Sequence, residues 1–219
     1  MVNFNSFRLF PLVFCAVLAG CAGTQPVNYS GITSSPQLRP NADDRTGRVP
    51  YSYSAGADWK KYASVIVEPV AIYQGADNQF DDISNADRST LANYMENHVK
   101  QSLGQRFRIV ETPAADTLRI KLTLTGAETT TPVLGTFSRF DLMGGPYNIV
   151  QSIRGKQGAL TGSVSYAVEI YEAATNRLLS AYVTKQYPNA LNIGASWGSL
   201  AAAEAGIDKG AEELVARLR

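Results

Sequence analysis

The stretch TLRIKLTLT at residues 117–125 alternates between apolar and polar side chains. Its apolar set is Leu118, Ile120, Leu122 and Leu124, and its polar set is Arg119, Lys121, Thr123 and Thr125. Successive side chains of a β-strand point to opposite faces of a sheet, so this strand has one apolar and one polar face. The pattern is typical of an antiparallel sheet with one face in water. A second layer has to cover the apolar face.

Four further segments predict strands. One of them is apolar and β-branched but contains Pro69, which favours a bulge or an edge position. Two others flank the tetrapeptide AATN and predict a hairpin, with Asn176 as the left-handed residue of its turn. The four segments are residues 62–73, 106–111, 162–172 and 177–187.

Two segments predict amphipathic helices. Ser84 or Asn85 can cap the first, and Gly104 supplies its C-terminal stop. The second is expected over about 197–218. Their apolar stripes are Leu91, Met95, Val99 and Leu103 in the first, and Leu200, Ile207, Ala211, Leu214, Val215 and Leu218 in the second.

The predicted order is strand, helix, strand, strand, long loop, strand, strand, helix. This order favours an α+β fold with a single two-layer domain. We expect a mainly antiparallel sheet of about five strands, with both helices on one face. No internal repeat is visible.

The N-terminus has the features of a secretory signal. Arg8 precedes an apolar run over 9–20, which is shorter than the roughly 20 residues that a membrane-spanning helix needs. The run ends in Leu-Ala-Gly-Cys, which resembles the lipobox of bacterial lipoproteins. That resemblance implies cleavage after Gly20 and a diacylglyceryl group on Cys21. The alternative is an ordinary signal peptide with a chance cysteine.

Three regions follow from this resemblance and from composition. Residues 1–20 are a lipoprotein signal peptide, 21–49 are the lipidated cysteine and a polar tether, and 50–219 are an α+β periplasmic domain. The tether is rich in Ser, Thr, Asn, Pro and Gly, and such composition cannot bury enough apolar surface to fold alone. Tyr29, Ile32 and Leu38 leave open that this segment folds back onto the domain, and this is the alternative to a free tether.

Charge and cysteine content narrow the function classes. The chain has 20 Lys and Arg against 19 Asp and Glu, and cleavage removes Arg8 and no acid, so the mature net charge is about zero. Without a basic run, the chain does not have the electrostatic footprint of a nucleic-acid-binding protein. Cys15 leaves with the signal peptide and Cys21 carries lipid, so no disulfide can form. Ala22 follows the cysteine at the position where aspartate is the commonest inner-membrane retention signal of bacterial lipoproteins. The resemblance therefore implies an outer-membrane location facing the periplasm.

One motif raises the possibility of an enzyme. GASWG at 194–198 matches the G-x-S-x-G nucleophile elbow, in which Ser196 would attack an acyl group with a histidine as base. The single histidine, His98, precedes the serine and sits beside the apolar stripe of the first helix, where a satisfied or surface histidine is the ordinary outcome. We expect Ser196 to cap the last helix instead.

No metal or cofactor is expected. Asp77, Asp81 and Asp82 are the nearest approach to a metal cluster, but their spacing does not match a calcium loop. Acids at the start of a helix explain them equally well. The GGPYN sequence lacks the lysine and the helix of a phosphate cradle.

The segment 130–160 is long, lacks a clear period and is too apolar for a solvated linker. Three hypotheses remain open: it folds over the sheet as core, it presents apolar side chains to a protein partner, or it touches lipid or holds an apolar ligand. The candidate contact residues are Phe137, Phe140, Leu142, Met143 and Tyr147.

Several stretches together resemble a family of bacterial lipoproteins, domain of unknown function 3313. They are NYSGIT, YASVIVEPVAIY, TLRIKLTLTGAETTTPV and VSYAVEIYEAATNRLLSAYV. The sequence departs from the family at Asn176, where glycine is usual, and at Ile32-Thr33, where a Phe-Leu pair is common. The family has no assigned chemistry, so the resemblance supports location and fold alone.

The sequence therefore favours a non-enzymatic lipoprotein of the outer membrane that acts in the periplasm as a binding or assembly accessory. Its expected partners are the membrane, through the lipid anchor, and an envelope protein. A carrier or sensor of an apolar small molecule is one alternative. A serine hydrolase using Ser196 is the other.

Overall fold

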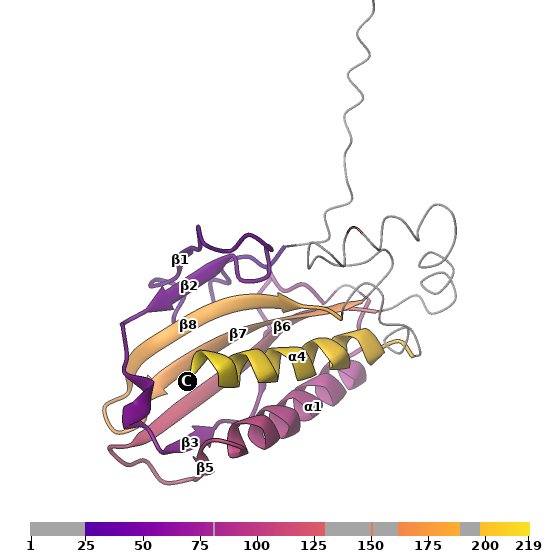
Figure 1. The fold of residues 1–219 in the computed structure, drawn as a ribbon. Coiled ribbons are helices and arrows are strands. Elements are labelled where there is room, and N and C mark those ends of the chain that lie inside the picture. Colours follow the sequence, from indigo (N-terminus) through magenta and orange to yellow (C-terminus); the bar gives the residue numbers. More distant parts are fainter. Residues whose placement is uncertain (1–24, 81, 130–149, 151–161, 189–197) are drawn as a thin grey trace, which may run out of the picture.

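The computed structural model describes residues 25–80, 82–129, 150, 162–188 and 198–219, which form one sheet with two long helices (Figure 1). Seven of the eight strands follow the order β1-β2-β8-β7-β6-β3-β5, and the eighth, β4, pairs with β6 off this path. The strands are β1 (Arg39–Pro40), β2 (Tyr51–Ser54), β3 (Ser64–Val67), β4 (Ala71–Ile72), β5 (Arg108–Ile109), β6 (Thr117–Glu128), β7 (Ser163–Glu172) and β8 (Arg177–Gln186). The helices are the 3-10 turn η1 (Trp59–Lys61), α1 (Asn85–Gly104) and α4 (Ala201–Arg217).

The α+β class and the two long helices are confirmed, but the sheet differs from its prediction. It is mixed rather than mainly antiparallel, and it has eight strands rather than about five. β3 pairs in parallel with β5 and β6, and β4 pairs in parallel with β6. The reason is that α1 connects β3 and β4 to β5 and β6, and such a helical crossover returns the chain in the same direction. The strands β1 and β2, which the sequence analysis did not predict, come from the chain before residue 55.

The strand predicted over 62–73 is divided in two at Pro69. Glu68 N donates to Ile120 O at 3.0 Å and Tyr73 N donates to Leu124 O at 2.9 Å, but Pro69 between them has no N–H to donate. The segment therefore forms β3 and β4 along β6, with a break in the pairing at the proline.

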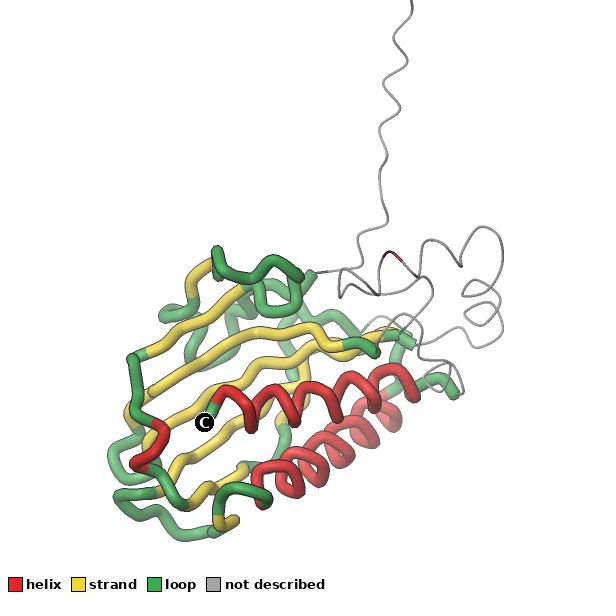
Figure 2. Tube along the Cα trace, viewed as in Figure 1, coloured by secondary structure: helices red, strands yellow, loops and turns green. Residues whose placement is uncertain are grey.

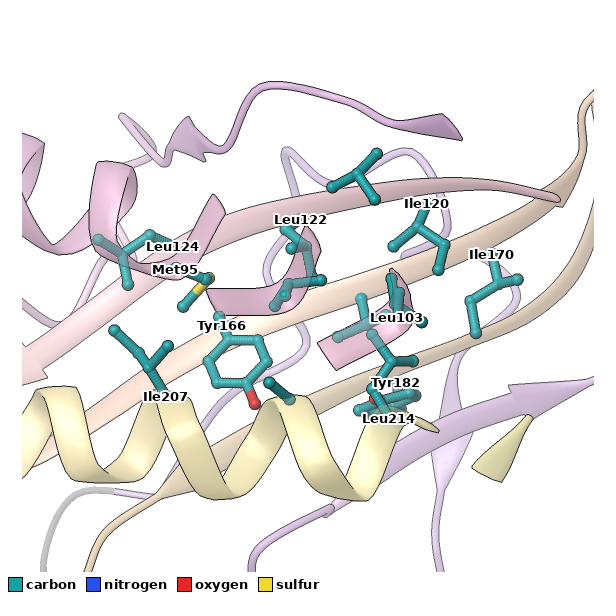
Figure 3. Close-up of a cluster of buried hydrophobic side chains, with 14 of the residues drawn as sticks. Met95, Leu103, Ile120, Leu122, Leu124, Tyr166, Ile170, Tyr182, Ile207 and Leu214 are labelled. Atoms are coloured by element: carbon teal, nitrogen blue, oxygen red, sulfur yellow. The ribbon is translucent and has the colours of Figure 1, made fainter. Parts of the chain in front are cut away.

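Both helices cover the same face of the sheet, as predicted (Figure 2). Their apolar stripes meet the alternating apolar side chains of the central strands (Figure 3). Burial of one such side chain stabilises the fold by about 1.5–3 kcal/mol. The labelled members are Met95 and Leu103 of α1, Ile207 and Leu214 of α4, and Ile120, Leu122, Leu124, Tyr166, Ile170 and Tyr182 of the sheet.

The starts of the two helices differ. Ser84 caps α1 as predicted, and its Oγ accepts a hydrogen bond from Asp87 N at 3.1 Å. By contrast, α4 begins at Ala201 after Leu200, which makes no side-chain cap. The prediction that this helix starts near 197 with Ser196 as its cap is therefore wrong. Gly198 has a φ of 105°, which a right-handed helix cannot contain, so the helix starts beyond it.

Two positions, Gly206 and Asn176, depend on special properties of the backbone. A Cβ on Gly206 of α4 would lie 2.8 Å from the carbonyl oxygen of Gln186, so only glycine lets this helix approach β8 so closely. In the β7–β8 hairpin, Asn176 has a φ of 58°, which confirms the predicted left-handed turn residue.

Residues 25–38, which we call the N-terminal strap, cross the sheet on the face opposite the helices. Tyr29, Ile32 and Leu38 are buried there against Ala167 and Val183 and other outer-face side chains. The prediction of a free tether is therefore wrong for residues 25–49, and the alternative in which the segment folds back is correct. The folded domain therefore includes residues 25–49 and does not begin at residue 50.

A buried carboxylate fixes the strap. Glu169 is 1% exposed, and its Oε1 accepts hydrogen bonds from Ser34 N at 2.7 Å and from the Tyr171 hydroxyl at 3.0 Å. Its Oε2 lies 3.4 Å from Lys121 Nζ. Thr123 and Thr125 are buried on this face as well, so the expectation of a face in water is wrong for them, whereas Arg119 and Lys121 stay partly exposed.

Tyr29→Ala should lower the free energy of unfolding by about 3 kcal/mol, since it removes a fully buried ring and a hydroxyl that donates to Gln79 Oε1 at 2.6 Å. Urea unfolding measures the loss. Ser30→Ala, at an exposed neighbour, is the control and should change stability by less than about 0.5 kcal/mol. If the two variants are equally stable, burial of Tyr29 does not stabilise the domain, and the segment is a free tether as first predicted.

Candidate functional site

The residues predicted for lipid attachment and for partner contact lie outside the described residues. They are Cys21 on the one hand, and Phe137, Phe140, Leu142, Met143 and Tyr147 on the other. Ser196 lies outside them too. Lipidation, partner contact and the serine hypothesis therefore stay predictions.

Asp77 holds the strap rather than a helix start. Its carboxylate accepts hydrogen bonds from the Tyr73 hydroxyl at 2.7 Å and from Ser30 N at 3.1 Å. The bond from Tyr73 holds the pKa of Asp77 below its usual value. Asp82 is exposed, and Asp81 lies outside the described residues. Within the described ranges, no group of three or more His, Cys, Asp or Glu residues could hold a metal ion.

His98 joins the two helices. Its ring stacks on Tyr94, with 3.9 Å between centroids, and its Nδ1 lies 2.7 Å from Asp208 Oδ1 of α4. The Tyr94 hydroxyl donates to the same carboxylate at 3.1 Å. Burial, together with the charge of Asp208, raises the pKa of Tyr94 to about 12. The expected satisfied histidine is confirmed, and its cross-helix partner is what the sequence did not reveal.

A polar groove lies between the loop 41–49 and α4. Its volume is about 410 Å³. We call it the loop–helix groove. The loop contributes Asn41, Asp43, Asp44, Thr46, Arg48 and Val49, and the helix contributes Lys209, Glu213 and Arg217.

Asp44 shapes the loop side of this groove. Its Oδ1 accepts hydrogen bonds from Thr46 N at 3.0 Å, the Thr46 hydroxyl at 2.7 Å and Gly47 N at 3.1 Å, and its Oδ2 accepts one from Val49 N at 2.6 Å. Burial raises the pKa of this carboxyl, but the hydrogen bonds from Thr46, Val49 and Gly47 outweigh it and keep the pKa below its usual value. The carboxylate therefore stays ionised and is used within the loop.

Arg48 forms the floor of the groove. Its guanidinium stacks on the Tyr187 ring, 4.3 Å from the centroid, and its Nη1 lies 3.6 Å from Glu213 Oε1. Gln186 Nε2 donates to the other Glu213 oxygen at 2.7 Å. Loop, β8 and α4 are joined by these contacts, so the groove is part of the fold rather than a gap at its surface.

The two remaining cations of the groove have no acid partner among the described residues. Arg217 lies over the Tyr182 ring, 4.6 Å from the centroid, and makes no ion pair within 4 Å in the described chain. Lys209 has neither a hydrogen bond nor an ion pair there. Burial, followed by the nearby charge of Arg48, lowers the pKa of Lys209.

Sequence reasoning missed this groove. One face of the last helix carries a charged residue at every fourth position, namely Lys209, Glu213 and Arg217. This spacing is the sequence feature that could have indicated the groove. Such spacing is ordinary on a solvated helix face, however. The loop side gives no signal, because residues 41–49 have the composition of a linker.

The comparison with protein families identifies the chain. The family model described as "Protein of unknown function (DUF3313)" matches residues 28–214. The chain belongs to this family. The match begins within the N-terminal strap, which agrees with a folded domain that includes it. No curated protein sequence matches this DUF3313 chain at a significant level.

Several solved structures resemble the DUF3313 fold at low identity. The PelC dodecamer from Paraburkholderia phytofirmans is 13% identical, with a TM-score of 0.38 over 74% of this chain and 94% of that chain. A DUF330 protein from Xanthomonas campestris is 9% identical, with a TM-score of 0.36 over 69% and 81%. A DUF4136 protein from Bacteroides thetaiotaomicron is 8% identical, with a TM-score of 0.35 over 77% and 95%. We transfer no activity or partner from them.

The helices were also compared with the requirements of a bilayer. In the part of the chain that the structure describes, neither α1 nor α4 has the length and apolar character to span a membrane.

Alkaline pH should weaken the fold. Folding raises the pKa of Tyr29 and of Tyr94 to about 12, whereas unfolded tyrosines ionise near pH 10. The neutral form is therefore favoured in the folded state, and this contribution is complete below pH 10 and lost between about pH 10 and 12. Urea midpoints across this range should fall, and Tyr94→Phe should flatten the decline. A slope in Tyr94→Phe equal to that of the wild type would contradict the raised pKa of Tyr94 in the folded state.

Proposed function

We propose that this DUF3313 protein is a non-enzymatic lipoprotein, anchored in the outer membrane through Cys21, with its domain in the periplasm as a binding or assembly accessory. The observation that carries the proposal is the attachment of the chain directly after the lipobox. Gln79 Nε2 donates to the Gln25 carbonyl at 2.8 Å, and Tyr29 is fully buried. The domain is thus fixed four residues after the proposed lipid site.

This attachment limits how far the domain can stand from the bilayer. Four residues of extended chain span at most about 14 Å. The proposal therefore differs from a leash that lets the domain sample a wide shell: one end of the sheet stays next to the membrane surface. Such placement suits a protein that holds a partner or a ligand at the membrane.

The described residues that flank the segment predicted to contact a partner lie at the same end of the sheet. Gln79, which holds Gln25, bridges to Gly126 near the end of β6. Two residues further, Glu128 accepts a hydrogen bond from the hydroxyl of Ser163, the first residue of β7, at 2.9 Å. The chain therefore departs for residues 130–161 and returns beside the anchored end, which supports a contact near the membrane.

Cys21→Ser should move the protein from the membrane fraction to the soluble periplasmic fraction and abolish the added diacylglyceryl mass. Fractionation and intact mass spectrometry measure the two effects. Cys15→Ser is the matched control, because this cysteine lies in the apolar core of the signal and should leave both results unchanged. Membrane retention of the Cys21 variant without added lipid would contradict the anchor.

Photo-crosslinking in the native envelope tests the accessory role. A probe replacing Phe137 or Phe140 should give a discrete protein adduct, which mass spectrometry then identifies. A probe at Glu212, on the exposed side of α4, is the control and should give none. Adducts to lipid alone, or no adducts at Phe137 and Phe140, would contradict the partner contact.

A further inference from the structure

We propose that the loop–helix groove is a binding site for a phosphate-bearing ligand, whose anionic group is held by Lys209, Arg217 and Arg48. The inference goes beyond the anchor and the accessory role, and it does not depend on lipidation. It rests on which charges of the groove are already used and which are not.

The sum of the charges that line the groove does not show which of these charged groups already have partners in the fold. Three cations and three acids line the groove, which would give a neutral site. However, Asp44 is saturated by four hydrogen bonds within its own loop, and Glu213 is bound to Gln186 and Arg48. The oxygens of these two acids are therefore occupied by the fold, and so in part is Arg48, whereas Lys209 and Arg217 have no acid partner among the described residues. The side chains of the groove without a partner are thus mainly cationic.

Two cations of the groove, Lys209 and Arg48, lie close to each other. Burial and the nearby charge of Arg48 lower the pKa of Lys209, and the charge of Glu213 offsets this only in part. Neither Lys209 nor Arg217 forms an ion pair with an acid within 4 Å among the described residues. Like charges in a partly buried site repel, and an anion placed between them removes that repulsion. The groove is thus arranged in advance for an anion.

Arg48 supplies a second and independent observation. The residue is only 8% exposed, yet its buried Nε has no hydrogen-bond acceptor among the described residues. Its contacts to Gln186 and to the Tyr187 carbonyl are long, at 3.5 Å each. Buried donors are normally satisfied, so the single unpaired Nε of a residue that lines the groove points to a missing acceptor.

The donor set favours phosphate over carboxylate. A carboxylate has two oxygens, and one arginine fork satisfies both. The groove offers two guanidinium groups and an ammonium, which suit the larger number of acceptor oxygens on a phosphate. Its volume of about 410 Å³ also exceeds what one phosphate fills and lies in the range of small-molecule sites. The ligand therefore carries a phosphate and a small polar substituent.

Asp43 indicates what that substituent is. It is the one acid of the groove with no hydrogen bond or ion pair among the described residues, and its side chain is exposed at the rim. It repels a bare anion and attracts a cation or a donor. In the headgroup of a zwitterionic phospholipid, the phosphate can contact the cations of the groove and the linked ammonium can contact Asp43. Free phosphate can contact the cations alone.

The first experiment is isothermal titration calorimetry of the full chain in uncharged detergent, with inorganic phosphate and with glycerophosphoethanolamine as probes. Lys209→Gln should lower the affinity for both probes by about fivefold or more, since it removes one charge-assisted contact. Lys61→Gln is the matched control, because this exposed lysine of η1 lies outside the groove and loses the same charge. It should leave both affinities unchanged.

Asp43→Asn separates the two sources of the phosphate and does not depend on the Lys209 variant. This variant should bind inorganic phosphate more tightly, because the repulsion between the Asp43 carboxylate and the phosphate is removed. If the natural ligand is a zwitterionic headgroup, the same variant should weaken glycerophosphoethanolamine. If it tightens both probes, the site is one for a soluble phosphate compound.

Two results would overturn the proposal. One is the absence of binding of either probe to the wild-type chain. The other is an equal loss of affinity in Lys209→Gln and Lys61→Gln, which would show only a response to total charge. Thermal unfolding of each variant accompanies the titrations, so that loss of fold is not mistaken for loss of the site.

Discussion

The buried carboxylate of Glu169 is the interaction on which the outer half of this fold depends. An ionised group in the interior costs several kcal/mol unless it is paired and hydrogen-bonded. Here Ser34 N and the Tyr171 hydroxyl donate hydrogen bonds at 2.7 and 3.0 Å, and the ammonium of Lys121 forms an ion pair at 3.4 Å. One of them belongs to the strap, so lifting the strap would leave a buried charge without its main-chain donor. The strap is therefore part of the domain, and it positions the loop that comes after it in the chain.

Elements with a local pattern could be predicted from the sequence, and those that depend on distant contacts could not. Leu91 to Leu103 recur at helical spacing, Ser84 can cap and Asn176 tolerates a positive φ, and all of these hold in the structure. The sequence offered the strap only as an alternative, because its polar composition resembles a linker and because Ser34 is held by Glu169, a residue 135 positions away. The parallel pairing escaped prediction because it follows from how α1 crosses over, which alternation in one strand does not encode.

The candidate groove illustrates the same limit. Asp44 and Thr46 build a turn within their own loop, and that much is local. The groove exists only because this loop meets Lys209 and Glu213 of α4, which lie at the other end of the sequence. Charged residues spaced by four on a helix are ordinary on a solvated face, so their role depends on what packs opposite them. Here the opposite side is Arg48, a buried cation that no pattern marks as buried.

The strap also connects the proposed anchor to the proposed site. A Cβ on Gly47 would lie 3.2 Å from Gln25 Oε1, so the backbone of the groove loop packs directly against the first described residue of the strap. If Cys21 carries lipid, that residue stands within about 14 Å of the bilayer surface, and the groove loop stands with it. A site that selects a phosphate next to a cation would then face the region where phospholipid headgroups are concentrated. The geometry of one short segment thus favours a headgroup over a soluble phosphate as the source of the ligand.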